Sequence, residues 1–471
     1  MTFADIQDPS HAIAAFTASL KDADIPNDVR VRGMHHLLDS AGIAMASATF
    51  DFAKRTMKAI HGLGGDGNVP VIGMGASLSP RDAAMVNGFL IHGLDFDDTH
   101  IAGVVHPSAS AFAAALSAAF HVDASGSEML TAYIIGIEVS ARLGAVAKGG
   151  FHQVGFHPTG VAGVFGATMT AGRLMGLTED QLQNALGLAL SLASGSLEFL
   201  EDGAWNKRFH PGWAAQAGIT AAAMAKEGFN GISSPFTGRF GLYNAYLGPL
   251  AENCDISLAS SGLGSEWELM KTAIKPYPAC HFTHSNIDAA LALRERGATL
   301  DKIDHITALV PAEVIKTVCE PEANKKRPSN SYDAQFSIPY LIATAITNNR
   351  MTLVELEDAA LHDPETLDLA NRVSYRADPD STFPKAYSGE LIVTLKDGTE
   401  LRHREHINRG ADERPLTNAE IVEKYNVNSA LAGSRDQATA MRDTLLSIDT
   451  DTPLASLLRA FAPSAAEPAH A

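Results

Sequence analysis

The chain has 471 residues, of which 46% are apolar and 19% charged, and its formal net charge is −18. This composition excludes a disordered or fibrous protein, and the length predicts two domains. The acidic balance argues against binding to nucleic acid or to an anionic membrane surface. Three widely spaced cysteines and an N-terminus without a signal-peptide pattern predict a cytoplasmic protein, and no membrane span is expected.

Residues 1–267 are predicted to form the first part of a helical domain. Apolar residues recur at helical spacing through 30–47. Many of the segments that repeat this pattern are rich in Ala and Gly, which lets helices approach closely. These further helical segments are 109–121, 127–147, 159–175, 178–194 and 213–226.

A different pattern begins near residue 268 and is typical of an α+β domain. Asp397-Gly398 predicts a hairpin turn that leads from the strand at 389–396 into ELRHREH (400–406). The other predicted strands are 303–310 and 371–376, and helices are predicted at 282–296 and 335–348. The sequence thus predicts a mainly α protein made of a helical domain (1–267), an α+β domain (268–412) and C-terminal helices (413–471) that return to the helical domain.

The stretch from Asn87 to Ser108 concentrates acids, bases and a hydroxyl. It begins as the end of a helix, and on a continuing helix Asp95 and Thr99 would share one face. His106-Pro107-Ser108 predicts a loop that enters the next helix, with Ser108 as a capping residue. Such a cluster at a helix end is suited to proton transfer.

Two later segments place further charged groups among Gly and aromatic residues. GGFHQVGFHPTG (149–160) carries His157 in an irregular loop before a helix. EFLEDGAWNKRFHPGWAA (198–215) supplies Lys207 and His210, which are three residues apart and would point the same way on a helical turn. This second segment provides the local positive charge that the overall balance lacks.

A third segment, IKPYPACHFTHSNIDAA (274–290), lies where helical patterns give way to the α+β domain. It carries Lys275, Tyr277 and His284, and a domain junction is a common place for a pocket. We expect Lys275 and Tyr277 to bind substrate. A fourth segment, 325–340, is a basic, hydroxyl-rich loop that leads into a helix.

The stretch from Asn87 to Ser108 also carries residue types that bind metal ions. Asp95, Asp97, Asp98 and His100 offer the carboxylates and imidazole that suit Mn or Fe. No second carboxylate-rich segment completes the ligand shell, so that no metal is expected. The chain also lacks GxGxxG, P-loop, GxSxG and HExxH motifs. The residues alone therefore indicate an acid–base enzyme with a partly basic pocket.

Six segments in order resemble the MmgE/PrpD family: HGLDFDDTH, the following HPS, GFHPTG, NKRFHPGWAA, KPYPACHFTH and PSNSYDAQFSIPY. That family includes 2-methylcitrate dehydratase, cis-aconitate decarboxylase and iminodisuccinate epimerase. The resemblance implies a large all-helical domain, a smaller α+β lid domain and a homodimer. It also implies an active site between the domains that needs no metal or organic cofactor.

Carried over position by position, the resemblance implies a lyase that acts on a small di- or tricarboxylic acid by acid–base proton transfer. Dehydration of a citrate-like hydroxy acid is the first candidate. Decarboxylation of a cis-aconitate-like acid and epimerisation of an iminodisuccinate-like acid are alternatives, and a helical protein that only binds a small acid is the non-enzymatic one. The implied catalytic residues are Asp95, His106, His157, Lys207 and His284, and the implied substrate-binding residues include Thr99 and His210.

Overall fold

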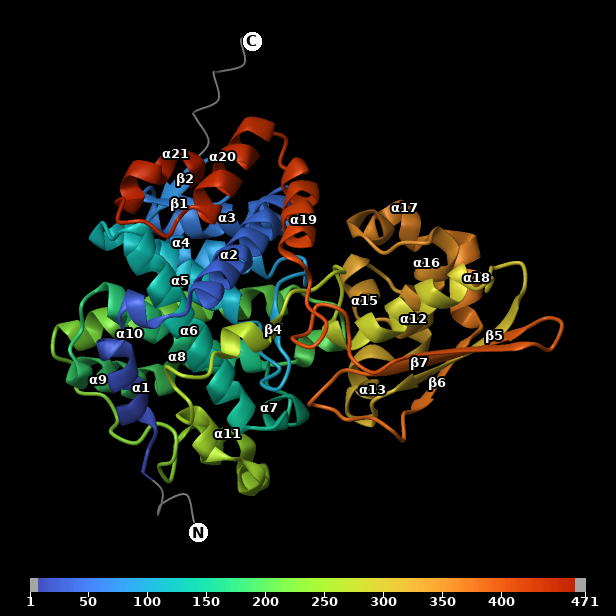
Figure 1. Cartoon of the computed structure of the whole chain (residues 1–471), viewed down its shortest axis with the longest axis horizontal. Helices are drawn as coiled ribbons and strands as arrows, with labels where there is room; N and C mark the ends of the chain where they lie inside the picture. The colour runs from blue at the N-terminus through green and yellow to red at the C-terminus, as the bar shows by residue number, and fades with distance from the viewer. Residues whose placement is uncertain (1–6, 462–471) are drawn as a thin grey trace. The chain divides into compact units, whose positions relative to one another are not determined.

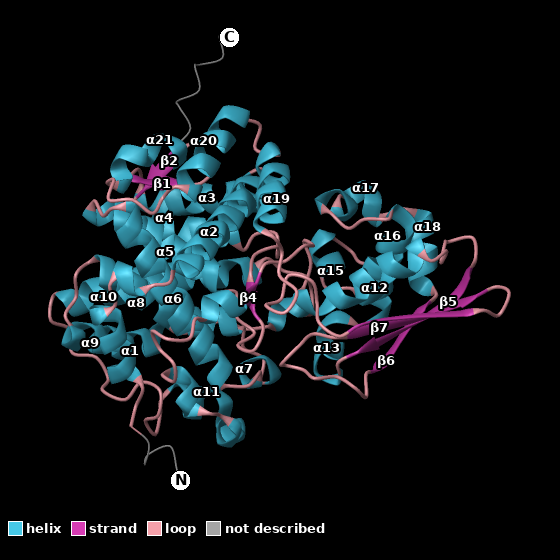
Figure 2. Cartoon of the chain, in the orientation of Figure 1, coloured by secondary structure: helices cyan, strands magenta, loops and turns pink. Residues whose placement is uncertain are grey.

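The structure is a computed structural model that describes residues 7–461, and the chain forms two compact units (Figure 1). The fold is mainly helical, as the sequence predicted, with small sheets (Figure 2). The outer ends of the predicted domains, 1–6 and 462–471, lie outside the described residues. Unit 1 comprises residues 7–197, 205–274 and 417–461, and unit 2 comprises residues 198–204 and 275–416.

Unit 1 is built around three buried helices, α5, α6 and α8, which pack on one another. Small residues permit this packing: a Cβ added at Gly166 of α8 would lie 2.4 Å from the carbonyl oxygen of Gly136 on α6. The longer helices of the unit are α1 (Ser10–Ser19), α2 (Asn27–Ala48), α3 (Asp51–Gly64), α4 (Pro80–Ile91), α5 (Pro107–Val122), α6 (Gly126–Val146), α8 (Pro158–Leu174), α9 (Glu179–Ala189), α10 (Asn206–Lys226), α19 (Asn418–Ala430) and α20 (Arg435–Leu446). The shorter ones are α7 (Gly150–Gln153), α11 (Leu242–Leu247) and α21 (Leu458–Phe461).

Helix α6 is the one described helix that is long and apolar enough to cross a membrane by length and composition. In the structure 94% of its apolar window is buried inside the protein. Its neighbours are α5 and α8. It is a core helix of unit 1, which accounts for its apolar composition.

The C-terminal helices pack on the N-terminal part of the same unit. Helix α19 packs along α2, and the two helices, red and blue, are neighbours in Figure 1. The ring of Tyr425 on α19 packs against Gly42 of α2. A Cβ added at Gly42 would lie 2.8 Å from the ring of Tyr425, so that only glycine fits there. The Tyr425 hydroxyl donates to the carbonyl of Ala438 on α20 at 2.7 Å. These contacts tie α2, α19 and α20 together.

Unit 1 also contains short strands that the sequence analysis did not predict. Strands β1 (Val69–Val71) and β2 (Ala76–Leu78) form an antiparallel hairpin, and β3 (Thr99–His100) pairs with β4 (Thr272–Ala273). Strands of two or three residues are too short to show an alternating pattern.

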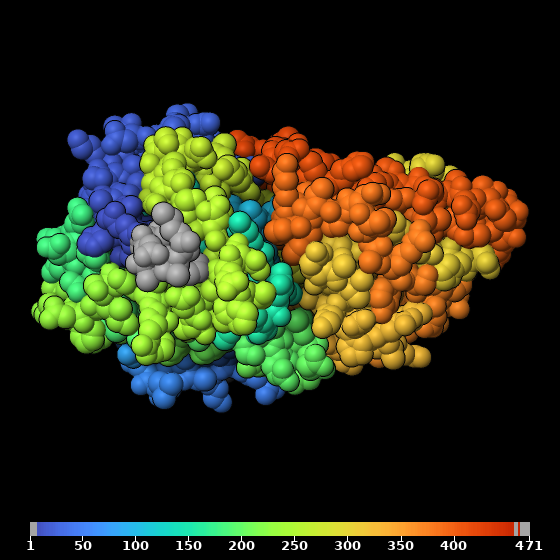
Figure 3. Space-filling model, turned by 90° about the horizontal axis from the view of Figure 1, so that it is seen from below, coloured from blue at the N-terminus to red at the C-terminus, as the bar shows by residue number. Residues whose placement is uncertain are grey.

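The segment after α10, drawn yellow-green, covers much of the face of unit 1 that is seen in Figure 3.

Unit 2 contains a four-stranded sheet in the order β6-β5-β7-β8. Strand β5 is parallel to β6 and antiparallel to β7, and β7 and β8 form the hairpin predicted at Asp397-Gly398. Helices α12, α16 and α18 pack against the sheet. The strands are β5 (Ile303–Val310), β6 (Val373–Ala377), β7 (Gly389–Leu395) and β8 (Glu400–Glu405). The helices are α12 (His284–Glu295), α13 (Ile315–Val318), α14 (Glu322–Lys326), α15 (Ser331–Gln335), α16 (Ile338–Asn348), α17 (Asp358–Leu361) and α18 (Pro364–Asn371).

Candidate active site

The stretch after α4 does not continue as a helix. Helix α4 ends at Ile91, and His92 is its C-cap. Asp95 then takes a left-handed backbone conformation with a φ of 50°, which Asp tolerates better than most residues. Thr99 and His100 form strand β3. The expectation that Asp95 and Thr99 share one helical face is therefore wrong, because the chain turns between them.

Asp98 supports the start of α5. Its Oδ1 accepts the backbone N–H of Ser108 at 3.2 Å, and the Ser108 hydroxyl donates to the same carboxylate. The Nδ1 of His36 on α2 lies 2.8 Å from Oδ2 of Asp98. A carboxylate from the preceding loop thus accepts a backbone N–H of the first turn of α5. The sequence had predicted Ser108 as the capping residue. Asp98 has a structural role.

Asp97 holds His92, a residue that the sequence analysis did not single out. The Nδ1 of His92 lies 2.9 and 2.8 Å from the two carboxylate oxygens of Asp97, and both side chains are buried. This contact orients the ring and assigns the proton to Nδ1, which puts the ring's lone pair on Nε2. His92 is the first residue of the motif HGLDFDDTH. Because it directly follows an apolar helix, the spacing of apolar residues does not distinguish it from a residue of the hydrophobic core.

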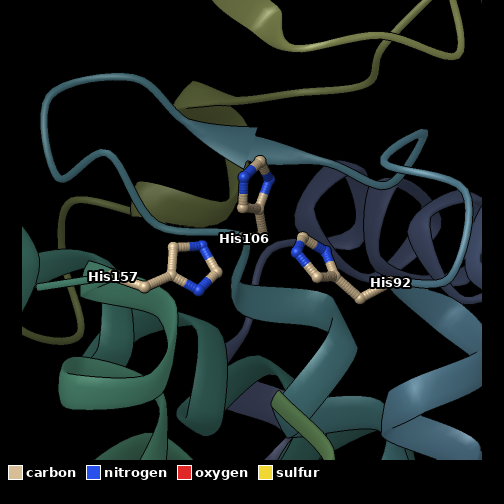
Figure 4. Close-up of side chains that lie close together, drawn as sticks. All are labelled: His92, His106 and His157. Atoms are coloured by element: carbon tan, nitrogen blue, oxygen red, sulfur yellow. The ribbon is translucent and has the colours of Figure 1, made fainter. Parts of the chain in front are cut away.

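Three buried imidazoles face one another at the centre of this region (Figure 4). The ring centroids of His92 and His106 are 4.8 Å apart, those of His92 and His157 are 5.6 Å apart, and those of His106 and His157 are 5.9 Å apart. The rings come from the end of α4, the N-cap of α5 and the N-cap of α8. Helix packing therefore gathers three distant segments at one point.

His106 is fixed by contacts on both its backbone and its ring. Its ring Nδ1 is 2.7 Å from the carbonyl oxygen of Asp98 and 3.1 Å from Oγ1 of Thr99. Its backbone N–H donates to Oγ1 of Thr159 on α8 at 3.0 Å. A carbonyl oxygen only accepts, so Nδ1 of His106 carries the proton and Nε2 carries the lone pair. The carbonyl of Asp98 and the hydroxyl of Thr99 together orient this imidazole.

His157 pairs with a fourth imidazole, that of His210 on α10. The two Nδ1 atoms are 3.0 Å apart and one of them donates to the other. Burial, followed by the charges of His210 and Lys207, lowers the pKa of His157 well below its ordinary value. Burial, followed by the charges of His92 and Lys207, lowers the pKa of His210 to about 4. Both rings are neutral at neutral pH and have a lone pair with which to take up a proton.

Lys207 and Asp95 form a buried ion pair at the edge of the imidazole cluster. The Nζ of Lys207 lies 2.7 Å from Oδ2 of Asp95, and the two side chains are 6% and 1% exposed. The neighbouring Arg208 anchors the same loop by donating to the carbonyl of Gly93 at 2.6 Å. Helix α10 starts at Asn206, seven residues before the predicted start at residue 213, and its first turn carries both cations and leads to His210.

Six of the predicted site residues thus come together in unit 1. They share one neighbourhood of buried side chains in which acid, base, hydroxyl and ammonium groups contact one another. Every one of them is less than about a tenth exposed. The six are Asp95, Thr99, His106, His157, Lys207 and His210, and His92 joins them.

The other three predicted site residues belong to unit 2. The Tyr277 ring lies 5.3 Å from that of His284, and its hydroxyl donates to Asp288 at 2.6 Å. The ring of His281, which the sequence analysis did not choose, lies 4.6 Å from that of His284. Lys275 is fully buried. Unit 2 therefore holds its own small cluster of predicted site residues.

Comparison with known proteins identifies relatives along most of the chain. The family model for the MmgE/PrpD N-terminal domain matches residues 11–252, and the model for the MmgE/PrpD C-terminal domain matches residues 277–449. A cis-aconitate decarboxylase of Aspergillus terreus is 28% identical over 95% of each chain. The cis-aconitate decarboxylase of Homo sapiens is 29% identical over 77% of this chain and 76% of its own. The 2-methylcitrate dehydratase of Escherichia coli is 25% identical over 88% of each chain.

Proposed function

We propose, from the premise that this chain belongs to the MmgE/PrpD family, that it is a lyase acting on a small di- or tricarboxylic acid. The observation that supports it is the gathering of buried imidazoles beside the Lys207–Asp95 ion pair. Proton transfer at a carbon next to a carboxylate needs that combination of a base and a fixed cation. No step of the proposal is assigned to a cofactor.

Lys207 is proposed to hold the substrate's charge. Loss of a proton or of CO₂ leaves negative charge that spreads onto a carboxylate that is already negative. A buried ammonium stabilises that charge better than an exposed one, because water screens it less. Asp95 keeps Lys207 in place in the absence of substrate, since their atoms are 2.7 Å apart.

His157 or His106 is proposed to exchange the proton at carbon. His157 is neutral because burial lowers its pKa, and its contact with His210 orients its ring. His106 is oriented by Thr99 and the carbonyl of Asp98. With both Nδ1 positions engaged, Nε2 is the atom that would take or give the proton.

Unit 2 is proposed to act as a lid that brings His284 to complete the catalytic site on closure and supplies Lys275 and Tyr277 to bind substrate. The support is the family resemblance and the burial of Lys275, Tyr277 and His284 within a single unit. A lid residue is expected to raise KM when it is removed, because it contributes to binding and closure. His284→Ala with a raised KM and an intact fold is the expected result, and an unchanged KM and kcat would remove His284 from the site.

Three net reactions fit the site. Dehydration of a citrate-like hydroxy acid, the first candidate from sequence, needs an acid at the departing hydroxyl as well as a base at carbon. Decarboxylation of a cis-aconitate-like acid needs only protonation at carbon, and it is favoured by the match that spans 95% of both chains. Epimerisation of an iminodisuccinate-like acid needs proton exchange alone. The products distinguish the three reactions.

The test is incubation of the protein with 2-methylcitrate, with cis-aconitate and with a panel of other di- and tricarboxylates in deuterium oxide, followed by proton NMR and CO₂ measurement. Unsaturated product without CO₂ indicates dehydration, and CO₂ with deuterium at carbon indicates decarboxylation. Exchange of the α-hydrogen alone indicates epimerisation. A protein that exchanges no proton of any of these acids would instead be a small-acid binding protein, and the proposal would fail.

The residue assignments have their own test. His157→Ala and Lys207→Ala are each expected to lower turnover by about 10²- to 10⁴-fold, the range for a positioned acid–base or charge-stabilising group. His121→Ala, at an exposed position in the last turn of α5, is the matched control and is expected to leave turnover unchanged. Turnover of His157→Ala within about tenfold of the parent would remove that assignment.

The assembly is proposed to be a homodimer, on the strength of the family resemblance. Large exposed apolar residues at the start of α10 support a buried surface there, since Trp205 and Phe209 are 44% and 43% exposed. Light scattering after size exclusion should give twice the chain mass of 49.8 kDa. A mass of one chain at micromolar concentration would contradict it.

A further inference from the structure

We propose that His92, His106 and His157 form a binding site for a divalent transition-metal ion of the zinc type, and that the bound ion blocks proton transfer. The metal ligands considered from the sequence were the carboxylates between Asp95 and Asp98 together with His100, and no metal was expected there. The structure brings together a different donor set, made of imidazoles from three segments. The binding stands on this geometry, and only the blocking effect rests on the proposed function.

The spacing of the three rings fits one small ion. One nitrogen from each ring lies within 4.8 Å of the other two. Zinc–nitrogen bonds of about 2.0–2.1 Å at tetrahedral angles put ligand nitrogens about 3.4 Å apart and ring centroids about 5 Å apart. The observed centroid distances are 4.8, 5.6 and 5.9 Å. Ring rotations that move each nitrogen by about 1 Å would therefore complete the site, with a fourth position left for water.

The Nδ1 atoms of these rings have the hydrogen-bond partners that metal-binding histidines commonly have on the nitrogen that does not bind the metal. Nδ1 of His92 is engaged by the Asp97 carboxylate, and Nδ1 of His106 donates to the carbonyl of Asp98. A carboxylate or carbonyl on Nδ1 fixes the tautomer and makes Nε2 a better electron donor to a metal. Nδ1 of His157 lies 3.0 Å from Nδ1 of His210, and the tautomer in which His157 donates to His210 puts the lone pair of His157 on Nε2. Each ring thus directs its Nε2 lone pair away from these contacts.

The charges nearby are compatible with a dication. Asp97 and Asp98 are buried within the same loop and contribute negative charge, while the ammonium of Lys207, whose charge acts on His157, is paired with Asp95. A donor set of three imidazole nitrogens favours Zn²⁺, Cu²⁺ or Ni²⁺ over Mg²⁺ or Ca²⁺, which prefer oxygen ligands. The site therefore selects borderline-soft cations.

Binding of the ion would remove the bases of the proposed reaction. A lone pair that coordinates a metal is not available to take up a proton, and His106 and His157 are the two candidates for proton exchange. Free zinc is therefore expected to inhibit the enzyme, and a chelator is expected to leave it fully active. Zinc would act as a regulator of this lyase rather than as its cofactor.

The binding test uses tag-free protein dialysed against a chelator, since an affinity tag of histidines would itself bind zinc. Titration with Zn²⁺ against a competing chromophoric chelator measures stoichiometry and affinity. Titration with Co²⁺ reports coordination through its visible absorption. We expect one ion per chain with a dissociation constant of micromolar or lower, and a Co²⁺ spectrum of a four-coordinate nitrogen site.

The variants that locate the ion are His92→Asn, His106→Asn and His157→Asn, each expected to weaken zinc binding at least tenfold. Asp97→Asn leaves all three ligands in place and is expected to weaken binding by about 10- to 100-fold through the contact behind His92. His121→Asn on the surface and His281→Asn in the imidazole pair of unit 2 are the controls, and zinc binding should be unchanged in both. Circular dichroism shows which variants are folded. If a variant of one of the three histidines is not folded, the effect of Asp97→Asn on zinc binding is the test.

The outcomes separate this inference from the proposed function. The absence of stoichiometric zinc binding, or binding that His281→Asn removes and His92→Asn does not, overturns the site. Stoichiometric binding by a protein that turns over no carboxylic acid supports the site while the proposed function fails. Zinc that binds at these residues and leaves turnover unchanged or raises it overturns the blocking effect.

Discussion

Lys207 and Asp95, 112 residues apart in the chain, form a buried ion pair with 2.7 Å between Nζ and Oδ2. Asp95 reaches this position because its backbone turns to a φ of 50° just after α4. Lys207 reaches it from the first turn of α10, which packs against α4. The sequence proposed both residues as catalytic without linking them. Because the two side chains contact each other, each one neutralises the buried charge of the other.

The first prediction concerns the stability of this pair. Lys207→Met or Asp95→Asn alone leaves one uncompensated buried charge, which costs about 3–5 kcal/mol of unfolding free energy. The double variant leaves none and should be more stable than the sum of the two losses predicts. Urea unfolding of the four proteins measures this. Lys54→Met, at an exposed position of α3, is the control for loss of a lysine; additive losses would show that the two side chains do not interact.

The second prediction assigns a positioning role to Lys424 on α19. Its Nζ donates to the carbonyl of Phe96 at 2.8 Å, lies 3.8 Å from the centroid of the Phe96 ring and is 2.8 Å from Oδ1 of Asp39. Phe96 follows Asp95 directly, so that the C-terminal helix holds the loop that carries the carboxylate.

Lys424→Met is therefore expected to lower kcat by about tenfold or more with a smaller change in KM, because a loop shift of about 1 Å misplaces reacting groups. Lys424→Arg keeps the cation and should recover part of the loss. Glu423→Gln, at the exposed neighbouring position, is the control. A kcat for Lys424→Met equal to that of the control would show that the loop holds its place without the lysine.

The third prediction concerns pH. Burial raises the pKa of Asp39 to about 6, although Lys424 opposes the shift. A carboxyl whose pKa is higher in the folded than in the unfolded state contributes stability that is present below its ordinary pKa of 3.8 and is lost as pH rises through about 6.

Replacing Asp39 by Asn removes this titration. The unfolding free energy of the parent, relative to that of Asp39→Asn, is expected to fall by about 1–3 kcal/mol between pH 4.5 and 7.5. Urea unfolding at several pH values measures the difference. Parallel curves for the two proteins across this range would contradict the raised pKa.

Most regular elements of the fold could be predicted from local pattern. Strand β5 coincides with the predicted strand at 303–310, and the β7–β8 hairpin follows from Asp397-Gly398. Periodicity did not show the β1–β2 hairpin, because three-residue strands carry too little pattern. The apolar pattern also predicted the start of α10 too late in the chain. Pro211 is typical of a helix boundary, but in the structure helix α10 continues through it.

The site could be predicted residue by residue but not contact by contact. Asp95, His106, His157 and Lys207 stood out because polar groups interrupt apolar helices at those points. Their partners depend on how helices pack over distances of 50 to more than 100 residues, which no local pattern encodes. His92 was missed for the opposite reason, since a single histidine at the end of an apolar helix looks like a residue of the core.

The last prediction tests whether helix spacing sets the site. A Cβ added at Gly88 of α4 would lie 2.8 Å from Cα and 2.9 Å from N of Gly212 on α10, both backbone atoms that have no freedom to rotate away. Gly88→Ala must push apart the two helices that lead to His92 and to Lys207. We expect a loss of about 1–3 kcal/mol in unfolding free energy, as for other overpacked contacts, together with a lower kcat.

Gly62→Ala in α3 is the matched control, since nothing lies within 4 Å of its added Cβ. It should be neutral or should stabilise the protein by about 0.5–1 kcal/mol, the ordinary gain from Gly to Ala in a helix. Urea unfolding and steady-state kinetics on both variants compare the two. A Gly88→Ala protein with the stability and kcat of Gly62→Ala would show that α4 and α10 tolerate a wider spacing, and that the positions of Lys207 and Asp95 do not depend on this close approach.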